Sequence, residues 1–238
     1  MVAGFPVALL ELVRCTDDGG ALAAPPGAPA AGVVVDGVVR CARCRREYPV
    51  RAGILRLLDQ TALDGESAHE LRLREAAADG YDEDMSRVRQ FDVMERLPTL
   101  AALEPLRDSV VLELGCGTGR FTVELARACR TLLAVDFSGA SLAVLAAKLG
   151  DAGMVGLVQA DVTRLAVAPG AFDRVASTLV SNLPTRAHRE AMLRLAAGAL
   201  RETGTFVFST HHYGVRERLR RLARDGRYDA GGIYRRLF

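Results

Sequence analysis

The sequence has no tryptophan, and aromatic residues make up only 5% of its 238 residues. Lys148 is the single lysine, so the 31 basic residues are almost all arginine. Together with abundant Ala, Gly, Val and Leu, this bias indicates a GC-rich, bacterial genome, and arginine richness is then weak evidence for phosphate binding. The formal net charge of +2 favours no nucleic-acid or membrane partner.

Long apolar runs and export features are also missing. No stretch reaches the roughly 20 apolar residues of a membrane span. The apolar start, residues 1–15, has no basic residues before the apolar run and no small-residue cleavage site, so we expect no signal peptide. The five cysteines are an odd number, which argues against a disulfide framework. These absences predict a cytoplasmic protein that does not enter a membrane.

Composition divides the chain into three predicted parts, which are residues 1–58, 59–104 and 105–238. The first part consists of short strands and turns, including a strand at 8–15, and Asp36-Gly37 between apolar runs predicts a hairpin turn. The second part is charged and rich in Ala and Leu. Its spacing is typical of amphipathic helices with a break at Gly80, and we expect it to act as a linker or lid.

The third part alternates strand-like and helix-like segments. Its five predicted strands lie in VVLELG, TLLAVD, GLVQAD, FDRVASTLV and TFVFSTH. Strands that alternate with helices indicate βαβ units and a parallel sheet. The predicted fold class is therefore α/β, with a mostly parallel Rossmann-like sheet and a small β-rich module at the N-terminus.

A glycine-rich loop, VVLELGCGTGRF, is the most specific feature of the sequence. A buried strand leads into Gly115, Gly117 and Gly119, and a helix follows from about Phe121. Glycines allow a tight turn and a close approach of the backbone to a ligand. A dinucleotide fingerprint needs a further glycine where Arg120 stands, so this loop favours a different cofactor.

The pattern E-x-G-x-G-x-G, with an acid at the end of the next strand, resembles the class I methyltransferases that use S-adenosylmethionine, over residues 109–212. The resemblance implies that Asp136 binds the ribose hydroxyls, that Asp161 faces the adenine amino group, and that Phe137 and Val162 flank the ring. Tyr81 is expected to cap the cofactor as a lid. The complete predicted cofactor-binding set is Glu113, Gly115, Cys116, Gly117, Gly119, Asp136, Phe137, Asp161, Val162, Ser177 and Tyr81. The alternatives are ordinary strand-end acids and another kind of nucleotide-binding domain.

Cysteines near the N-terminus form a second pattern. Cys15 and Asp18 precede Cys41-Ala-Arg-Cys44, where two C-x-x-C knuckles would build a tetrahedral zinc site. The segment resembles the small zinc-ribbon proteins that activate transfer-RNA, ribosomal and release-factor methyltransferases, and ribbons fused to bacterial methyltransferases. Asp18 replaces one cysteine of that pattern. The alternatives are structural zinc on these four side chains and a ribbon held by its apolar core with reduced thiols.

The acceptor is less well specified. His211 and His212 follow the fifth strand and are the candidate general bases for a hydroxyl acceptor, unless they are ordinary polar residues at a strand end. Residues 177–184 lack the Asn/Asp-Pro-Pro-Tyr motif, which argues against adenine and glutamine acceptors. We therefore expect methyl transfer to oxygen, nitrogen or carbon of a small molecule, such as a secondary metabolite. The alternatives are an RNA or translation-factor methyltransferase and a non-catalytic cofactor-binding regulator.

The C-terminal segment adds two expectations. Eight arginines between 216 and 236 belong either to a solvated helix or to a surface that contacts RNA or an acidic small substrate. The sequence stops at Phe238, before the helix and hairpin that usually complete the sheet in the family it resembles. Either the C-terminal elements are truncated or another subunit covers the edge, which would favour a homodimer.

Overall fold

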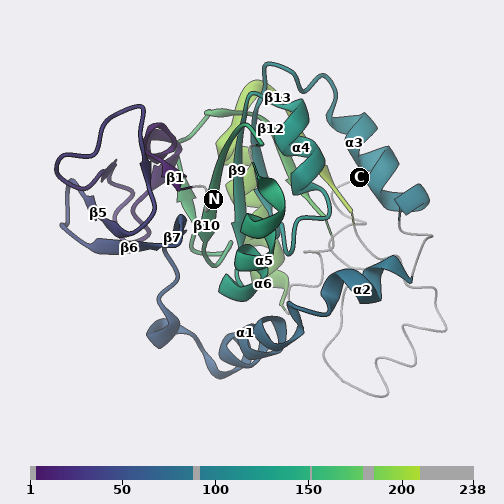
Figure 1. The fold of residues 1–238 in the computed structure, drawn as a ribbon, viewed down its shortest axis with the longest axis horizontal. Helices are drawn as coiled ribbons and strands as arrows, with labels where there is room; N and C mark the ends of the chain where they lie inside the picture. Colours follow the sequence, from purple (N-terminus) through teal and green to yellow (C-terminus); the bar gives the residue numbers. More distant parts are fainter. Residues whose placement is uncertain (1–3, 88–91, 151, 179–184, 210–238) are drawn as a thin grey trace.

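The computed structural model describes residues 4–87, 92–150, 152–178 and 185–209. Within these residues one nine-stranded sheet has the order β13-β12-β8-β9-β10-β7-β6-β5-β3 (Figure 1). Its parallel part is formed by β8 (Val110–Leu114), β9 (Thr131–Asp136), β10 (Met154–Gln159), β12 (Phe172–Ser177) and β13 (Leu200–Phe208). The predicted α/β fold class with a mostly parallel sheet is confirmed.

Side-chain alternation along the strands separates two apolar layers. On β9, Leu132 and Ala134 face one core, whereas Leu133 and Val135 face the other. The first core lies under α3 (Leu97–Leu103), α4 (Thr122–Ala128) and α5 (Gly139–Leu149). The second lies under α6 (Arg186–Ala199) and the N-terminal module. Helices therefore cover one face of the parallel sheet, and α6 shares the other face with residues of the module.

The N-terminal module continues the central sheet. Its elements are β1 (Phe5–Pro6), the 3-10 helix η1 (Val7–Leu12), β2 (Val13–Arg14), β3 (Leu22–Ala23), β4 (Val33–Val34), β5 (Gly37–Cys41), β6 (Glu47–Arg51) and β7 (Ile54–Arg56). Strand β7 pairs in parallel with β10, and the short β11 (Ala166–Val167) pairs with β2. Gly156 of β10 allows this packing, because an added Cβ would lie 2.9 Å from Leu9 and 3.0 Å from Phe5.

Two expectations for the module are wrong. Residues 8–15 are mostly 3-10 helix, which begins after Pro6 and buries Leu9, Leu10 and Leu12. Asp36-Gly37 does not turn a hairpin, because β4 pairs with β1 while β5 pairs with β6 and β3. The Asp36 carboxylate instead accepts a hydrogen bond from the Ala52 N–H at 3.1 Å.

The tight hairpin lies between β6 and β7. Its two loop residues, Ala52 and Gly53, have φ of 48° and 75°. Positive φ at both central positions is typical of a type I′ turn, whose twist matches that of the flanking strands. This turn returns the chain to β10 and so joins the module to the parallel sheet.

The segment between the module and the parallel strands is helical, as expected. It contains the 3-10 turn η2 (Gln60–Ala62), α1 (Gly65–Ala77), α2 (Tyr81–Ser86) and the π-helix η3 (Asp92–Arg96). Gly80 separates α1 from α2, as the sequence predicted. In the described part of the chain, no helix has the length and apolar character needed to cross a membrane.

Candidate cofactor cavity and cysteine cluster

The glycine loop connects β8 to α4 by three residues with positive φ. Gly115, Gly117 and Gly119 have φ of 77°, 53° and 97°. The Gly115 and Cys116 N–H groups donate to the Val135 carbonyl at 2.8 and 3.0 Å, which ties the loop to the neighbouring strand. An added Cβ on Gly117 would meet nothing within 4 Å. The loop therefore leaves space beside its backbone, where a ligand can approach closely.

Asp136 ends β9 beside this loop. Its Oδ2 accepts the Gly117 N–H at 2.7 Å, and its Oδ1 accepts the Ser138 N–H at 2.8 Å. Burial raises the pKa of this carboxyl, while the two backbone N–H groups oppose that rise. The hydrogen bonds orient the carboxylate, and each oxygen retains a lone pair that can accept from a ligand hydroxyl.

A cavity of about 200 Å³ opens over the glycine loop and the ends of β9 and β10. Seven predicted cofactor-binding residues line it, namely Tyr81, Gly115, Gly117, Asp136, Phe137, Asp161 and Val162. Asp161 is itself oriented, because its Oδ1 accepts the Thr163 N–H at 2.8 Å and the Thr163 hydroxyl at 2.7 Å. The topology thus gathers side chains from three strand ends and from α2 around one space.

The other four predicted residues lie behind the cavity wall. Cys116 is buried in the core under α4 and α5. An added Cβ on Gly119 would lie 2.4 Å from Leu145 Cδ1, so Gly119 is required for helix packing. The Ser177 hydroxyl contacts Met192 Sδ at 3.4 Å, while its neighbour Thr178 lines the cavity.

Glu113 is the fourth of these residues, and it is buried on β8. Burial raises its pKa to about 7, and the nearby Asp136 carboxylate adds to the rise. Within the described residues, its Oε2 atom accepts no hydrogen bond. A buried acceptor without a partner is costly, so this oxygen is suited to a hydrogen bond from a ligand or a bridging water.

Sequence reasoning missed the α1 side of the cavity and His188. Ser67, Glu70, Arg74 and Ala77 recur at three or four residues and line the cavity together. This helical spacing in the predicted lid was the signal that could have identified them. His188 on α6 also lines the cavity, and its Nδ1 lies 2.5 Å from the Thr185 hydroxyl. His211 and His212, the predicted general bases, lie outside the described residues.

Helices α1 and α2 are attached to the parallel domain by polar contacts. The Glu75 carboxylate of α1 accepts the N–H groups of Gly139 and Ala140, at 2.6 and 3.2 Å, at the start of α5. Asp82 of α2 accepts the Thr118 hydroxyl at 2.7 Å and forms an ion pair with Lys148. These contacts fix α1 and α2 beside the cavity that some of their residues line.

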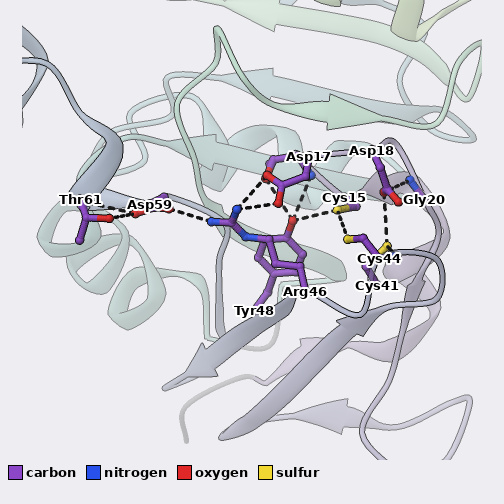
Figure 2. A network of polar contacts seen from close by, with 11 residues as sticks. Cys15, Asp17, Asp18, Gly20, Cys41, Cys44, Arg46, Tyr48, Asp59 and Thr61 are labelled. Carbon is purple, nitrogen blue, oxygen red and sulfur yellow. Dashed lines mark hydrogen bonds and ion pairs between the residues drawn. The ribbon is translucent and has the colours of Figure 1, made fainter.

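The four predicted metal ligands come together in the module, beside Tyr48 (Figure 2). The Sγ atoms of Cys15, Cys41 and Cys44 and a carboxylate oxygen of Asp18 lie within 4.8 Å of one another. We call these four side chains the cysteine cluster. Cys15 Sγ is 3.6 Å from Cys44 Sγ and 3.1 Å from the Tyr48 hydroxyl. The fold therefore brings together four candidate metal ligands from two turns that are far apart in sequence.

Hydrogen bonds within the cluster favour thiolate character at Cys41. Its Sγ accepts the N–H groups of Arg43 and Cys44 at 3.3 and 3.4 Å. Burial acts in the opposite direction, yet the N–H groups hold the pKa of Cys41 below its usual value. Asp18 accepts the Gly20 N–H through Oδ1 at 2.8 Å, and its buried Oδ2 accepts no hydrogen bond within the described residues.

Known methyltransferases are similar to this chain in sequence and in fold. Residues 111–204 match the family model described as a methyltransferase domain. These residues form a methyltransferase domain. The solved DhpI–SAM–HEP complex has a TM-score of 0.55 and 24% identity, and the match covers 67% of this chain and 71% of that chain. For the DhpI–SAH complex the TM-score is 0.52 and the identity 26%, with 62% and 71% covered.

Among curated proteins, phosphoethanolamine N-methyltransferase 3 of Arabidopsis thaliana is 46% identical over 52 residues, which is 22% of this chain and 11% of that protein. Phosphoethanolamine N-methyltransferase 1 of the same plant is 48% identical over a segment of equal length. The match thus spans about a tenth of these relatives. In its family model and fold, this part of the chain is similar to the class I methyltransferases that use S-adenosylmethionine.

Proposed function

We propose that the chain transfers a methyl group from S-adenosylmethionine to a small-molecule acceptor at oxygen, nitrogen or carbon. The observation that carries the proposal is the oriented Asp136 carboxylate, which lines the cavity beside the open backbone of Gly117. Asp136 would accept the ribose hydroxyls, and Asp161 would accept from the adenine amino group between Phe137 and Val162.

The charges of the cavity also fit the cofactor. Glu70, Asp136 and Asp161 are acidic, and Arg74 is the permanent cation among the residues that line it. An excess of acidic groups favours a cationic ligand. When bound, S-adenosylmethionine supplies an electrophilic methyl group on a positively charged sulfur. The unpartnered Glu113 oxygen behind the loop adds a buried acceptor near the same space.

Catalysis in such a site depends on placement of the acceptor and exclusion of water. Helix α1 and Tyr81 line one side of the cavity, where they would limit the access of water once cofactor and acceptor are bound. Among the described residues that line the cavity, His188 is the one with an imidazole side chain. Its ring is oriented by the contact of Nδ1 with the Thr185 hydroxyl. We propose His188 as a base for an acceptor that must lose a proton, in addition to the predicted His211 and His212. Arg74 would contact an anionic part of such an acceptor.

Calorimetric titration with S-adenosylmethionine and S-adenosylhomocysteine, with NAD as the control ligand, tests the cofactor assignment. Loss of a charged hydrogen-bonding group costs roughly 1.5–3 kcal/mol, so Asp136→Asn should weaken binding by about 10- to 100-fold. Asp108→Ala removes an exposed acid just before β8 and should bind as the wild type does. Equal affinities of the wild type and Asp136→Asn would refute the assignment.

The acceptor requires a separate test. Incubation with methyl-labelled cofactor and a panel of small hydroxyl, amine and phospho-amine compounds should yield a labelled small product. Labelled RNA or labelled protein in matched reactions would instead support the RNA or translation-factor alternative. Cofactor binding without turnover of any acceptor class would support a regulatory role.

We further propose that the cysteine cluster binds structural zinc. Zinc takes thiolate and carboxylate ligands, and a tetrahedral site with Zn–S bonds of roughly 2.3 Å places ligand atoms roughly 3.8 Å apart. The Cys15–Cys44 separation of 3.6 Å fits such a set, and so does Asp18 Oδ2, which accepts no hydrogen bond within the described residues and lies 3.8 Å from Arg43 Nε. The N–H bonds to Cys41 would stabilise its thiolate.

Metal analysis of the purified chain should find one zinc per molecule, and cobalt exchange should give the absorption of a tetrahedral thiolate site. Cys44→Ser should lose the metal. Cys129→Ser, which lies outside the cluster, should keep it. A metal-free wild type that also fails to take up cobalt would show that the module is held by its apolar core alone.

A further inference from the structure

We propose that Arg46 is a positioning residue that connects the cysteine cluster to helix α1, so that a metal in the cluster stabilises the position of α1 at the cofactor cavity. The inference rests on the proposed zinc and cofactor sites. It adds to them a coupling between the module and the methyltransferase domain, for which the physical connection is the set of hydrogen bonds by which Arg46 joins Asp17 to Asp59 (Figure 2).

Arg46 joins the two segments directly. Its Nη1 donates to both Asp17 carboxylate oxygens, at 2.8 and 2.6 Å, and its Nη2 donates to Asp59 Oδ2 at 2.9 Å. Its guanidinium also lies over the Tyr48 ring, 5.7 Å from the centroid. Only one third of the Arg46 side chain is exposed, so the ion pairs are partly shielded from water.

The cluster fixes one end of this connection. Arg46 follows Cys44 by two residues, and Asp17 lies between Cys15 and Asp18. The Tyr48 hydroxyl contacts Cys15 Sγ and accepts the Thr16 N–H, each at 3.1 Å. Binding of a metal by side chains on both turns would therefore hold Asp17 and Arg46 in their observed relative positions.

Asp59 carries the connection toward α1. Its Oδ1 accepts the Thr61 N–H and hydroxyl at 3.0 and 2.6 Å, which caps the short turn η2. Only Leu63 lies between η2 and Asp64, which caps α1 by accepting the Ser67 N–H at 2.7 Å. The position of Asp59 therefore determines where α1 begins.

Helix α1 is the element whose position can respond. Leu71 is its only buried side chain, so little apolar area holds it against the domain. Polar anchors at its ends, including Glu75 on the first N–H groups of α5, supply much of its attachment. An element with few buried contacts opens locally at low cost. Release of the Asp59 anchor should open α1 and remove the Arg74 side of the cavity.

Binding at the two sites should then be mutually favourable. Coupling between sites in proteins is typically 5- to 150-fold in affinity and acts equally in both directions. We expect removal of the metal to weaken S-adenosylhomocysteine binding by about tenfold, which lies within that range. In Arg46→Gln, the metal should remain bound while the affinity for S-adenosylhomocysteine no longer depends on it.

The experiment measures S-adenosylhomocysteine affinity by calorimetry for the full chain, with and without zinc removal by a chelator. Wild type, Arg46→Gln and Asp59→Asn are compared with Arg40→Gln, which removes an exposed ion pair of the same module. Asp59→Asn weakens the same ion pair from the other segment, so it provides a second test of the connection if Arg46→Gln does not fold. Metal content is determined for every sample.

Hydrogen exchange of residues 65–77 provides a readout that is independent of cofactor binding. Faster exchange there after chelation, and in Arg46→Gln and Asp59→Asn with zinc bound, supports the connection. Unchanged exchange in both variants, or equal cofactor affinity with and without zinc in the wild type, overturns it. A wild type that binds zinc and shows coupled exchange but binds no cofactor would refute the proposed function alone.

Discussion

Two glycines of the same loop serve different purposes at the residue scale. Gly117 leaves space where an added Cβ would meet nothing within 4 Å, whereas an added Cβ on Gly119 would lie 2.4 Å from Leu145. The first glycine therefore serves access to the backbone, and the second serves packing of the loop against α5. The sequence pattern alone does not distinguish these two roles.

We expect Gly119→Ala to destabilise the fold. Positive φ costs a non-glycine residue roughly 1–2 kcal/mol, and overpacking against the fully buried Leu145 adds roughly 1–3 kcal/mol. Urea unfolding should therefore show a loss of about 2–5 kcal/mol in the free energy of unfolding. Gly198→Ala in α6, where an added Cβ meets nothing, should be neutral or stabilising. Similar losses in both variants would contradict the packing role.

Glu113 should make stability depend on pH. Its pKa of about 7 in the folded state lies above the reference value of 4.5, so the folded state binds the proton more tightly. Protonation of Glu113 therefore stabilises the folded state fully below pH 4.5, and this stabilisation is lost as pH rises through about 7. The free energy of unfolding should fall by about 3 kcal/mol over this pH range.

Unfolding free energies of wild type and Glu113→Gln at pH 5 and pH 8 measure this contribution. The amide cannot ionise, so Glu113→Gln should lack this pH-dependent loss and should be the more stable protein at pH 8. A wild-type loss that equals that of Glu113→Gln would show that Glu113 ionises in the folded state as it does in the unfolded chain.

At the scale of elements, the N-caps of α5 and α1 differ in burial. Ser138 begins α5 and is fully buried, with its hydroxyl accepting the Ser141 N–H at 3.1 Å. Asp64 begins α1 and is exposed. The same capping interaction is therefore buried in the core in α5 and exposed at the start of α1, which lines the cavity.

Removal of each cap should have a different effect. A lost N-cap costs about 1 kcal/mol of helix stability. Ser138→Ala should lower the global unfolding free energy by about that amount, because α5 packs against the sheet. Asp64→Ala should instead raise hydrogen exchange in residues 65–77 with little change in global stability. A global loss in Asp64→Ala as large as that in Ser138→Ala would show that α1 unfolds only with the whole domain.

At the scale of the whole molecule, the module and the methyltransferase domain share one core. Phe5, Leu9 and Leu55 of the module belong to the same buried cluster as Val135 and Val158 of the parallel strands. The β7–β10 pairing joins their backbones in one sheet. A continuous core and a continuous sheet predict that the two parts unfold together.

Urea unfolding monitored by hydrogen exchange should give the same urea midpoint for strands β5–β6 and for strands β8–β9. Phe5→Ala removes a fully buried ring and should cost about 3 kcal/mol, which lowers both midpoints equally. Val38→Ala, at a side chain that is 37% exposed, should change neither. Separate midpoints, or a shift confined to β5–β6, would show that the module is an independent folding unit.

The sequence by itself determined the parallel βαβ architecture, the break at Gly80 and the residues of the glycine loop and cysteine cluster. Hydrophobic periodicity and glycine spacing are local properties, so they can be read without knowledge of distant contacts. The predicted hairpin at Asp36-Gly37 was wrong because the partners of β4 and β5 are set by packing against other strands.

Only the tertiary structure decided which residues surround the cavity and how the module is attached. Arg74 and His188 are far apart in sequence and meet at the cavity because α1 and α6 both pack around the strand ends. The attachment of β7 to β10 and the contacts of Arg46 with Asp17 and Asp59 are likewise long-range. Such contacts depend on the relative placement of whole elements, and no local pattern of residue types encodes that placement.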